Sequence, residues 1–255
     1  MPDVSDLLQS HFGFDTFRGP QQQIIEHVLH GQHALVIMPT GRGKSLCYQI
    51  PALAIAAAQS DGQQPAITLV LSPLIALMKD QVDALQNRGI KATFINSSLR
   101  KNEREARYRA IAEGRYALLY VTPERFRKPE FLEVIAKRTV TLLAVDEAHC
   151  ISEWGHDFRP DYTRLSELRT VMGNPTTIAL TATATPEVQT DIVRQLGLEP
   201  HEIHLFHEGI DRPNLELRVQ DVWDADEKAA AMMQIFDKWQ TADATGSGIV
   251  YFTLI

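Results

Sequence analysis

Short runs of apolar residues, without the polar alternation of a half-exposed strand, recur along most of the chain. They predict buried strands at 33–37, 66–71, 92–95, 117–121, 142–145 and 177–180. Apolar positions at helical spacing lie before and between them and predict helices at 4–12, 21–30, 74–87, 101–112, 130–136, 162–171 and 186–196. Strands that alternate with helices in this way are typical of a mostly parallel sheet with helices on both faces, so the predicted fold class is α/β.

The alternating pattern continues to about residue 208, which we take as the end of a first domain, 1–208. Asp211-Arg212-Pro213-Asn214 is typical of a linker. Beyond it we expect a strand at 215–219, a helix at 226–239 and a strand at 249–252. A β–α–β unit that ends on its second strand cannot cover both faces of a sheet. Residues 209–255 are therefore predicted to be a linker and the truncated start of a second domain.

A glycine-containing turn follows the strand at 33–37. Its residues are Met38-Pro39-Thr40-Gly41-Arg42-Gly43-Lys44-Ser45, and a helical pattern follows directly. Strand, glycine turn, Lys-Ser and helix in this order are typical of a phosphate-binding loop. Glycines let backbone N–H groups approach phosphate oxygens, Lys44 can reach the β- and γ-phosphates, and the Ser45 hydroxyl can bind Mg²⁺. An ordinary strand-to-helix turn is the alternative, because the general pattern has a glycine where this chain has Met38.

The composition is that of an ordinary globular protein, with 44% hydrophobic and 22% charged residues. Cys47 and Cys150 stand alone, without the spacing of a zinc site or a disulfide framework, and this fits a reducing compartment. No apolar run approaches the length of a membrane span, and the first residues do not resemble a signal peptide. We therefore expect a cytoplasmic location and no zinc in these residues.

Charge is distributed unevenly around a net value of −7. Residues 100–138 contain eleven Lys or Arg and six Asp or Glu, a local net of +5, whereas residues 220–255 contain two and six, a local net of −4. A basic central region can contact phosphates although the whole chain is acidic. The alternative is a solvated helix face on which Glu103 and Glu105 pair with neighbouring arginines.

An acidic motif, Asp146-Glu147-Ala148-His149, follows the apolar strand at 142–145. The carboxyl end of a central parallel strand is where such sheets place their chemistry. Asp146 can hold Mg²⁺, and Glu147 can orient and deprotonate the water that attacks a γ-phosphate. A strand-ending acidic turn without function is the alternative for an isolated Asp-Glu pair.

Together, Lys44-Ser45, the acidic motif and Thr181-Ala182-Thr183 resemble the motor core of superfamily 2 helicases. The phosphate loop of that superfamily reads T-G-x-G-K-[S/T], so Met38 is ordinary there. The resemblance implies a RecA-like domain that uses ATP and Mg²⁺. It assigns catalysis to Lys44, Asp146, Glu147 and His149, the metal to Ser45 and Asp146, and the nucleotide to Thr40, Gly41, Arg42, Gly43, Lys44 and Ser45.

Two further stretches resemble RecQ-type DNA helicases. Phe14, Phe17, Arg18 and Gln21 resemble the adenine motif F-R-x-x-Q of that family. A glutamine is suited to pair with adenine N6 and N7, and an aromatic ring and an arginine can stack on the base. The resemblance gives these roles to Gln21, Phe14 and Arg18; core packing is the alternative for the two phenylalanines.

The second stretch, 150–162, resembles the aromatic-rich loop that couples DNA binding to ATP hydrolysis in the RecQ family. The resemblance implies that Trp154 and Phe158 stack on the bases of single-stranded DNA, and that His156 and Arg159 contact phosphate or the nucleotide site. A small packing cluster is the alternative for the two aromatic residues.

Weaker resemblances to the DNA-contacting motifs of the family occur at 71–81 and at Thr122-Pro123-Glu124. They imply that Ser72, Lys79 and Thr122 contact the DNA backbone without reading its sequence. Ser-Pro and Thr-Pro pairs commonly just start helices, which is the alternative.

The resemblance covers residues 6–252 and implies an ATP-dependent 3′–5′ DNA helicase that acts in repair or recombination, with single-stranded or partly duplex DNA as its partner. Two departures stand out. RecQ proteins usually have a third glycine where this chain has Arg42, and the later motifs of the second motor domain, including its arginine finger, do not occur in these 255 residues. Such an arginine is worth several orders of magnitude in turnover, so we expect this polypeptide to bind ATP–Mg²⁺ weakly, to hydrolyse it very slowly and not to unwind DNA by itself.

Two other functions fit parts of the pattern. An RNA helicase of the DEAH type shares the phosphate loop and acidic motif, although the long aromatic loop and F-R-x-x-Q favour the RecQ type. A truncated, non-catalytic module that binds DNA or a partner is the alternative outside enzymes.

Overall fold

The computed structural model describes residues 2–59, 66–154, 158–209, 215–241 and 247–251, with the side chains of 239–241 excepted. The chain divides into two units, 1–211 and 212–255, and each is described by itself. The predicted linker at 211–214 lies mostly outside the described residues, and the domain limits at 208 and 209 stay a prediction.

Unit 1 is built on one sheet of seven strands in the order β3-β4-β2-β5-β6-β1-β7, and every neighbouring pair is parallel. The strands are β1 (His33–Ile37), β2 (Ala66–Leu71), β3 (Ala92–Ile95), β4 (Leu118–Val121), β5 (Thr139–Asp146), β6 (Thr176–Thr181) and β7 (Ile203–His207). The predicted α/β class with a parallel sheet is confirmed.

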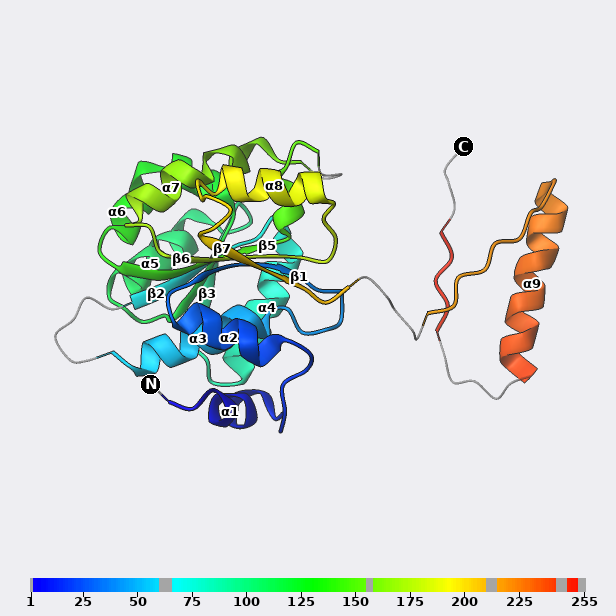
Figure 1. Ribbon diagram of the computed structural model, residues 1–255, viewed down its shortest axis with the longest axis horizontal. Helices are drawn as coiled ribbons and strands as arrows, with labels where there is room; N and C mark the ends of the chain where they lie inside the picture. The colour runs from blue at the N-terminus through cyan, green and yellow to red at the C-terminus, as the bar shows by residue number, and fades with distance from the viewer. Residues whose placement is uncertain (1, 60–65, 155–157, 210–214, 242–246, 252–255) are drawn as a thin grey trace. The chain divides into compact units, whose positions relative to one another are not determined.

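Helices cover both faces of this sheet: α2 and α3 lie on one side, and α7 and α8 on the other (Figure 1). The helices of unit 1 are α1 (Val4–Leu7), α2 (Gln21–Leu29), α3 (Leu46–Ala57), α4 (Ile75–Asn87), α5 (Lys101–Ala112), α6 (Pro129–Ile135), α7 (Leu165–Val171) and α8 (Pro186–Gln195). Among the helices in the described parts of the chain, none combines the length and the apolar character that crossing a membrane requires.

The apolar runs become strands because both faces of the sheet are covered. All residues of β2, β3 and β4 are buried. Their side chains therefore have no solvent-facing side, and a continuous apolar sequence is the one that such a strand tolerates. The helix limits follow local chemistry, as in α8, where the Thr185 side chain accepts the Val188 N–H and Pro186 occupies the first turn.

The prediction from the sequence missed one strand, β7, and made another, β5, too short. β7 was not predicted because three of its five residues are exposed and two of the five are histidines. It lies at one edge of the sheet and pairs with β1. β5 begins at Thr139, three residues before the predicted strand. The pairing register of β5 with β2 shifts there, between Ile67 and Thr68, which interrupts the simple pattern.

Unit 2 contains the predicted helix, α9 (Ala225–Thr241), but not the predicted strands. Asp224 accepts the Glu227 N–H, and the Glu227 carboxylate accepts the Trp223 N–H, so the helix start is capped. Residues 215–219 and 247–251 have irregular backbone, which corrects the strand predictions. A strand needs a neighbour to receive its backbone hydrogen bonds, and no strand pairs with them among the described residues.

Candidate functional site

The predicted phosphate loop, acidic motif and Thr181 meet at the carboxyl edge of the sheet. Ile37, the last residue of β1, lies opposite Thr181 in β6, and Leu180 lies opposite Asp146, the last residue of β5. The Met38 N–H extends this pairing by donating to the Thr181 carbonyl at 3.1 Å. Segments that are far apart in the sequence are therefore neighbours at one edge because their strands are adjacent.

The phosphate loop uses two of its residues as left-handed turns. Gly41 has φ 84° and Gly43 has φ 78°, whereas Arg42 between them is not in the positive-φ region. Glycine is thus required on either side of Arg42 but not at Arg42, which explains how this loop accommodates a side chain there. The Lys44 ammonium donates to the Met38 carbonyl at 3.0 Å. The side chain therefore folds back toward the start of the loop.

Gln21 lies under the phosphate loop. Its side-chain amide N–H groups donate to the Arg42 carbonyl at 2.9 Å and the Gly43 carbonyl at 3.1 Å, and its Oε1 accepts the Arg18 N–H at 2.8 Å. Only 1% of Gln21 is exposed. The amide that was expected to pair with adenine is therefore engaged by the backbone of the loop, because α2 begins directly beneath it. In this structure Gln21 supports the loop, and its adenine contact stays a prediction.

The other residues of the adenine motif divide between surface and core. The guanidinium carbon of Arg18 lies 5.7 Å from the centre of the Phe14 ring, and both side chains are exposed. Such a pair offers a flat, polarisable face for a base. Phe17 instead packs against the small cluster of Leu8, Ile25 and Ile50, so core packing accounts for Phe17 but not for Phe14.

Asp146 has the environment of a metal ligand. It is 8% exposed, and burial, followed by the charge of Glu147, raises the pKa of its carboxyl to about 6. The Lys44 charge and a hydrogen bond from the Glu147 N–H, at 3.0 Å, act in the opposite direction. A divalent cation would stabilise this buried carboxylate.

The donor set also fits Mg²⁺, which prefers oxygen ligands and commonly takes one or two from a protein. Ser45 directly precedes α3 at the end of the phosphate loop, and Asp146 is the last residue of β5. The hydroxyl and the carboxylate that the predicted metal site requires are therefore both present at this edge of the sheet.

An Asp146→Asn variant is expected to be more stable than the original protein at neutral pH without metal. Because the pKa in the folded state lies above the value of 3.8 for a free aspartate, the folded state binds the proton more tightly. The stability from this proton is present at low pH and is lost as the pH rises through about 6. Asparagine removes the buried charge, and we expect a gain of about 1–3 kcal/mol at about pH 7.5.

Urea unfolding in EDTA at about pH 7.5 and about pH 4.5 measures this difference. The gain should shrink at the lower pH, where Asp146 carries a proton. Asp83→Asn, on the exposed face of α4, is the matched control and should change stability little. A loss of stability in Asp146→Asn that is equal at both pH values would contradict a cost of burying this charge.

Glu147, His149 and Thr181 form one group of polar side chains. The Thr181 hydroxyl donates to the Thr183 carbonyl at 3.0 Å and lies 3.0 Å from His149 Nδ1. A hydroxyl has one proton, so His149 Nδ1 is the donor toward Thr181. The same nitrogen lies 3.4 Å from Glu147 Oε2. The acidic motif is therefore linked to the Thr-Ala-Thr motif through the histidine.

Glu147 itself is held in an unusual backbone conformation, with φ 51°. A left-handed conformation is uncommon for a residue other than glycine, and such strain gathers at functional sites. It turns the chain sharply at the end of β5 and starts the 3₁₀ turn Ala148–Ile151.

The aromatic-rich loop begins where that turn ends. Trp154 is 76% exposed, whereas Phe158 and Arg159 are half-buried. Arg159 donates to the Pro73 carbonyl at 3.0 Å, which ties this loop to the segment that follows β2. His156 lies outside the described residues, so its predicted contact stays a prediction. Of the two aromatic side chains, Trp154 and Phe158, that of Trp154 is the more exposed and can stack on a base.

The three predicted backbone contacts to DNA differ in exposure. Lys79 lies on the exposed face of α4, whereas Ser72 and Thr122 are 2% and 6% exposed. Each hydroxyl residue directly follows a buried strand, and this position keeps it below the surface. Ser72 Oγ has no hydrogen-bond partner among the described residues. Lys79 is thus the residue of the three that presents its side chain to solvent.

The basic region at 100–138 divides between structural and surface charges. Arg138 is buried and donates to the carbonyls of Ile111, Ala66 and Tyr116. Arg107 donates to the Phe94 carbonyl and lies over its ring. These arginines hold strands and helices together, so the local net charge overstates what this region can offer to a nucleic acid.

A buried polar network that was not predicted from the sequence lies next to the phosphate loop. The Gln49 amide donates to the Tyr120 hydroxyl at 3.1 Å and to Gln81 Oε1 at 3.0 Å, and Tyr120 donates to the Tyr48 hydroxyl at 3.4 Å. Since Tyr48 also meets Ser45, the network runs from the loop to α4. Its members lie on α3, β4 and α4, and no sequence spacing relates them.

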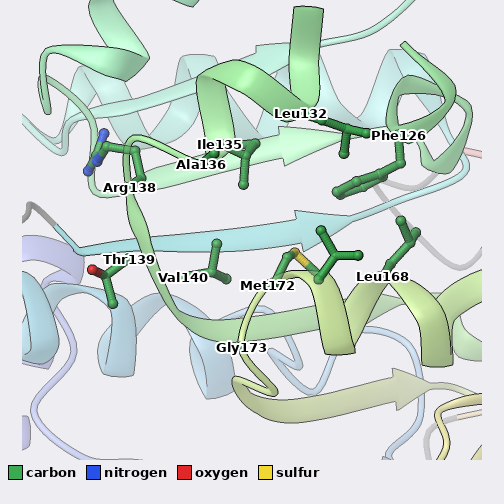
Figure 2. Close-up of a pocket in the computed structure, with 11 residues that line it drawn as sticks. Phe126, Leu132, Ile135, Ala136, Arg138, Thr139, Val140, Leu168, Met172 and Gly173 are labelled. Carbon is green, nitrogen blue, oxygen red and sulfur yellow. The ribbon is translucent and has the colours of Figure 1, made fainter. Parts of the chain in front are cut away.

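A cavity of about 370 Å³ lies elsewhere, between β5, α6 and α7 (Figure 2). Its lining is mostly apolar, and Arg138 at its edge already donates to three carbonyls. None of the predicted site residues lines it. The chemistry is therefore assigned to the sheet edge and not to this cavity.

Comparisons with known proteins find similarity to helicases over most of the chain. Residues 18–192 match the model of the DEAD/DEAH box helicases. The ATP-dependent DNA helicase RecQ of Haemophilus influenzae is 44% identical over 250 residues, which cover 98% of this chain and 38% of that protein. The probable ATP-dependent DNA helicase RecS of Bacillus subtilis is 42% identical over 252 residues, covering 98% of this chain and 47% of that protein. The chain thus spans less than half the length of these relatives.

Solved structures are similar at the level of the fold. The helicase domain of Pyrococcus furiosus Hef has a TM-score of 0.56 at 21% identity, covering 82% of this chain and 40% of that one. A hypothetical ATP-dependent RNA helicase from Sulfolobus tokodaii has a TM-score of 0.57 at 19% identity, covering 80% and 56%. The predicted RecA-like architecture of the first domain is confirmed by these neighbours.

Proposed function

The chain belongs to the DEAD/DEAH box helicase family, and from that premise we propose that it is the ATP-binding motor domain of a RecQ-type DNA helicase. The observation that carries the proposal is the meeting of Lys44, Asp146 and Glu147 at one sheet edge, with His149 and Thr181 joined to Glu147. This arrangement provides a phosphate cradle, a carboxylate for a cation and a second carboxylate for a water.

The roles follow from the chemistry of each group. Backbone N–H groups of the phosphate loop and the Lys44 ammonium bind the triphosphate, and the site orients it toward Glu147. Ser45 and Asp146 would hold Mg²⁺, which would neutralise part of the phosphate charge. Glu147 accepts the proton of the attacking water. His149 Nδ1 faces both Glu147 and Thr181, so a change in the charge of Glu147 acts on the contact between His149 and Thr181.

The proposed polymer substrate is single-stranded or partly duplex DNA. The exposed Trp154 offers a face on which a base can stack, and Lys79 offers a charge for a backbone phosphate. Several relatives bear the name of an ATP-dependent DNA helicase. Movement from 3′ to 5′ and a role in DNA repair or recombination belong to this proposal through the RecQ resemblance, and a cytoplasmic location stays a prediction.

These 255 residues alone are proposed to bind ATP–Mg²⁺ and DNA but to hydrolyse ATP slowly. The resemblance places the arginine that stabilises charge on the transferred phosphate in the second motor domain. An arginine finger is worth roughly 10³–10⁵ in turnover in related phosphoryl-transfer enzymes.

The test measures binding and hydrolysis by the purified chain. We expect binding of a non-hydrolysable ATP analogue with Mg²⁺, tighter binding to a single-stranded DNA oligonucleotide than to the RNA of the same sequence, and little ATP turnover with either. Trp154→Ala should weaken DNA binding by about 1–3 kcal/mol, whereas Trp223→Ala, another exposed tryptophan, is the matched control.

Three outcomes would contradict parts of the proposal. Preference for RNA would favour the DEAH-type RNA helicase. DNA binding without nucleotide binding would favour the non-catalytic module. Rapid DNA-stimulated hydrolysis by the 255 residues would overturn the expectation of slow turnover.

A further inference from the structure

Arg42, the residue at which the phosphate loop departs from the RecQ pattern, is paired with an acid from the edge strand next to β1. Its Nε lies 3.5 Å from Oε1 of Glu208, the residue that directly follows β7. The Arg42 side chain is 48% exposed, and that of Glu208 is 16% exposed. The sequence does not point to Glu208, because only the pairing of β7 with β1 brings it near Arg42.

Glu208 is firmly placed at this point. Its N–H donates to the Ile37 carbonyl at 3.0 Å, so its backbone extends the pairing of β7 with the strand that enters the loop. Gly19, beside Arg18 of the adenine motif, makes room for the carboxylate: a Cβ on Gly19 would lie 2.7 Å from Glu208 Oε1. Glu208 Oε2 is buried and accepts no hydrogen bond from the described residues. Among the described residues, Arg42 is the cation that forms an ion pair with this carboxylate.

Arg42 is therefore bound from two sides. Gln21 donates to its backbone carbonyl, and Glu208 holds its guanidinium. A guanidinium on a phosphate loop is also suited to a triphosphate oxygen, because its planar N–H groups match phosphate geometry. A carboxylate close to the same loop, without a cation, repels a triphosphate.

Resting on the proposed function, we propose that Arg42 and Glu208 set the affinity of the loop for nucleotide as an opposed pair. Glu208 is an internal anion that competes with the triphosphate for the guanidinium of Arg42, and Arg42 in turn neutralises the carboxylate that would repel the triphosphate. Arg42 would contact the triphosphate directly, and Glu208 is a positioning residue that acts through Arg42. A chain with glycine at position 42, as in the family pattern, and an uncharged residue at position 208 would lack both charges of this pair.

The two single variants are then expected to have opposite effects. Glu208→Gln releases Arg42 and should tighten the binding of a non-hydrolysable ATP analogue with Mg²⁺ by about threefold, since an exposed charge contact is worth little. Arg42→Gln leaves the carboxylate uncompensated and should weaken binding by about threefold to tenfold. The double variant should bind within about twofold of the original affinity, because it removes both charges and their effects on nucleotide binding are opposite.

Isothermal titration at low and high salt provides the measurement, and thermal unfolding verifies that each variant is folded. The differences should shrink at high salt, because the side chain of Arg42 is half-exposed. Glu167→Gln, which removes an acid paired with Arg164 on the surface, is the matched control for net charge and should leave affinity unchanged.

The pair as proposed is overturned if Glu208→Gln weakens binding as Arg42→Gln does, because a purely structural clamp on the loop predicts that result. Unchanged affinity in both single variants overturns it as well. Lys44→Ala separates these failures from a failure of the proposed function: if that variant also binds as the original does, the loop is not a nucleotide site.

Discussion

A Lys44→Ala variant is expected to bind ATP–Mg²⁺ about 30- to 140-fold more weakly than the original chain, corresponding to about 2–3 kcal/mol. The Lys44 ammonium is half-buried at the loop and donates to the Met38 carbonyl. In the bound state it would donate to phosphate oxygens, which are charged acceptors and make stronger hydrogen bonds than a neutral carbonyl. Alanine removes this gain, and the remaining N–H groups of the loop retain part of the affinity.

Titration of a non-hydrolysable ATP analogue measures the loss. Lys79→Ala is the matched control for charge, because Lys79 is exposed on α4 and belongs to the proposed DNA surface; it should leave nucleotide affinity within about twofold. Since Lys44→Ala also removes the bond to Met38, its thermal unfolding is measured alongside. Equal nucleotide binding by the folded variant and the original would show that this loop is not the phosphate site.

The sheet could be predicted in detail because its strands satisfy one simple condition, burial on both faces. β1, β2 and β3 have the predicted limits, and the predicted order of helices and strands holds through α8. β7 was missed because three of its five residues are exposed and it has no continuous apolar sequence, whereas β3, at the other edge of the sheet, is buried and was predicted. The prediction of strands in unit 2 was wrong for another reason. A strand forms only where a neighbouring strand receives its hydrogen bonds, and an apolar run in the sequence does not show whether such a neighbour is present.

The candidate site was predictable as far as its residues lie in short motifs. That Lys44, Asp146 and Glu147 lie at one edge could be predicted because each motif follows a strand, and parallel strands bring such ends to one edge. Glu208, in contrast, meets Arg42 only through the placement of β7, which the sequence did not reveal. Gln21 was recognised as part of a motif, but its contacts to the loop carbonyls depend on where α2 begins.

A Glu147→Gln variant is expected to retain nucleotide binding and to lose hydrolysis by about 10²–10⁴-fold. Glutamine has the same shape and can keep an oxygen toward His149 Nδ1, but it cannot accept the proton of the attacking water. It also tolerates the left-handed backbone at this position as glutamate does, so the sharp turn after β5 should persist. The effect should therefore be confined to the chemical step.

Single-turnover hydrolysis, with the protein in excess over ATP, measures this step even where turnover is slow. Nucleotide affinity should stay within about threefold of the original, in contrast to Lys44→Ala, and Glu133→Gln on the exposed face of α6 should behave as the original does. If Glu147→Gln weakens binding and leaves the hydrolysis rate of bound ATP unchanged, Glu147 is not the base. The opposite patterns of the two variants are the sharpest distinction between a motor domain and a module that only binds, because a binding module has no step for Glu147 to accelerate.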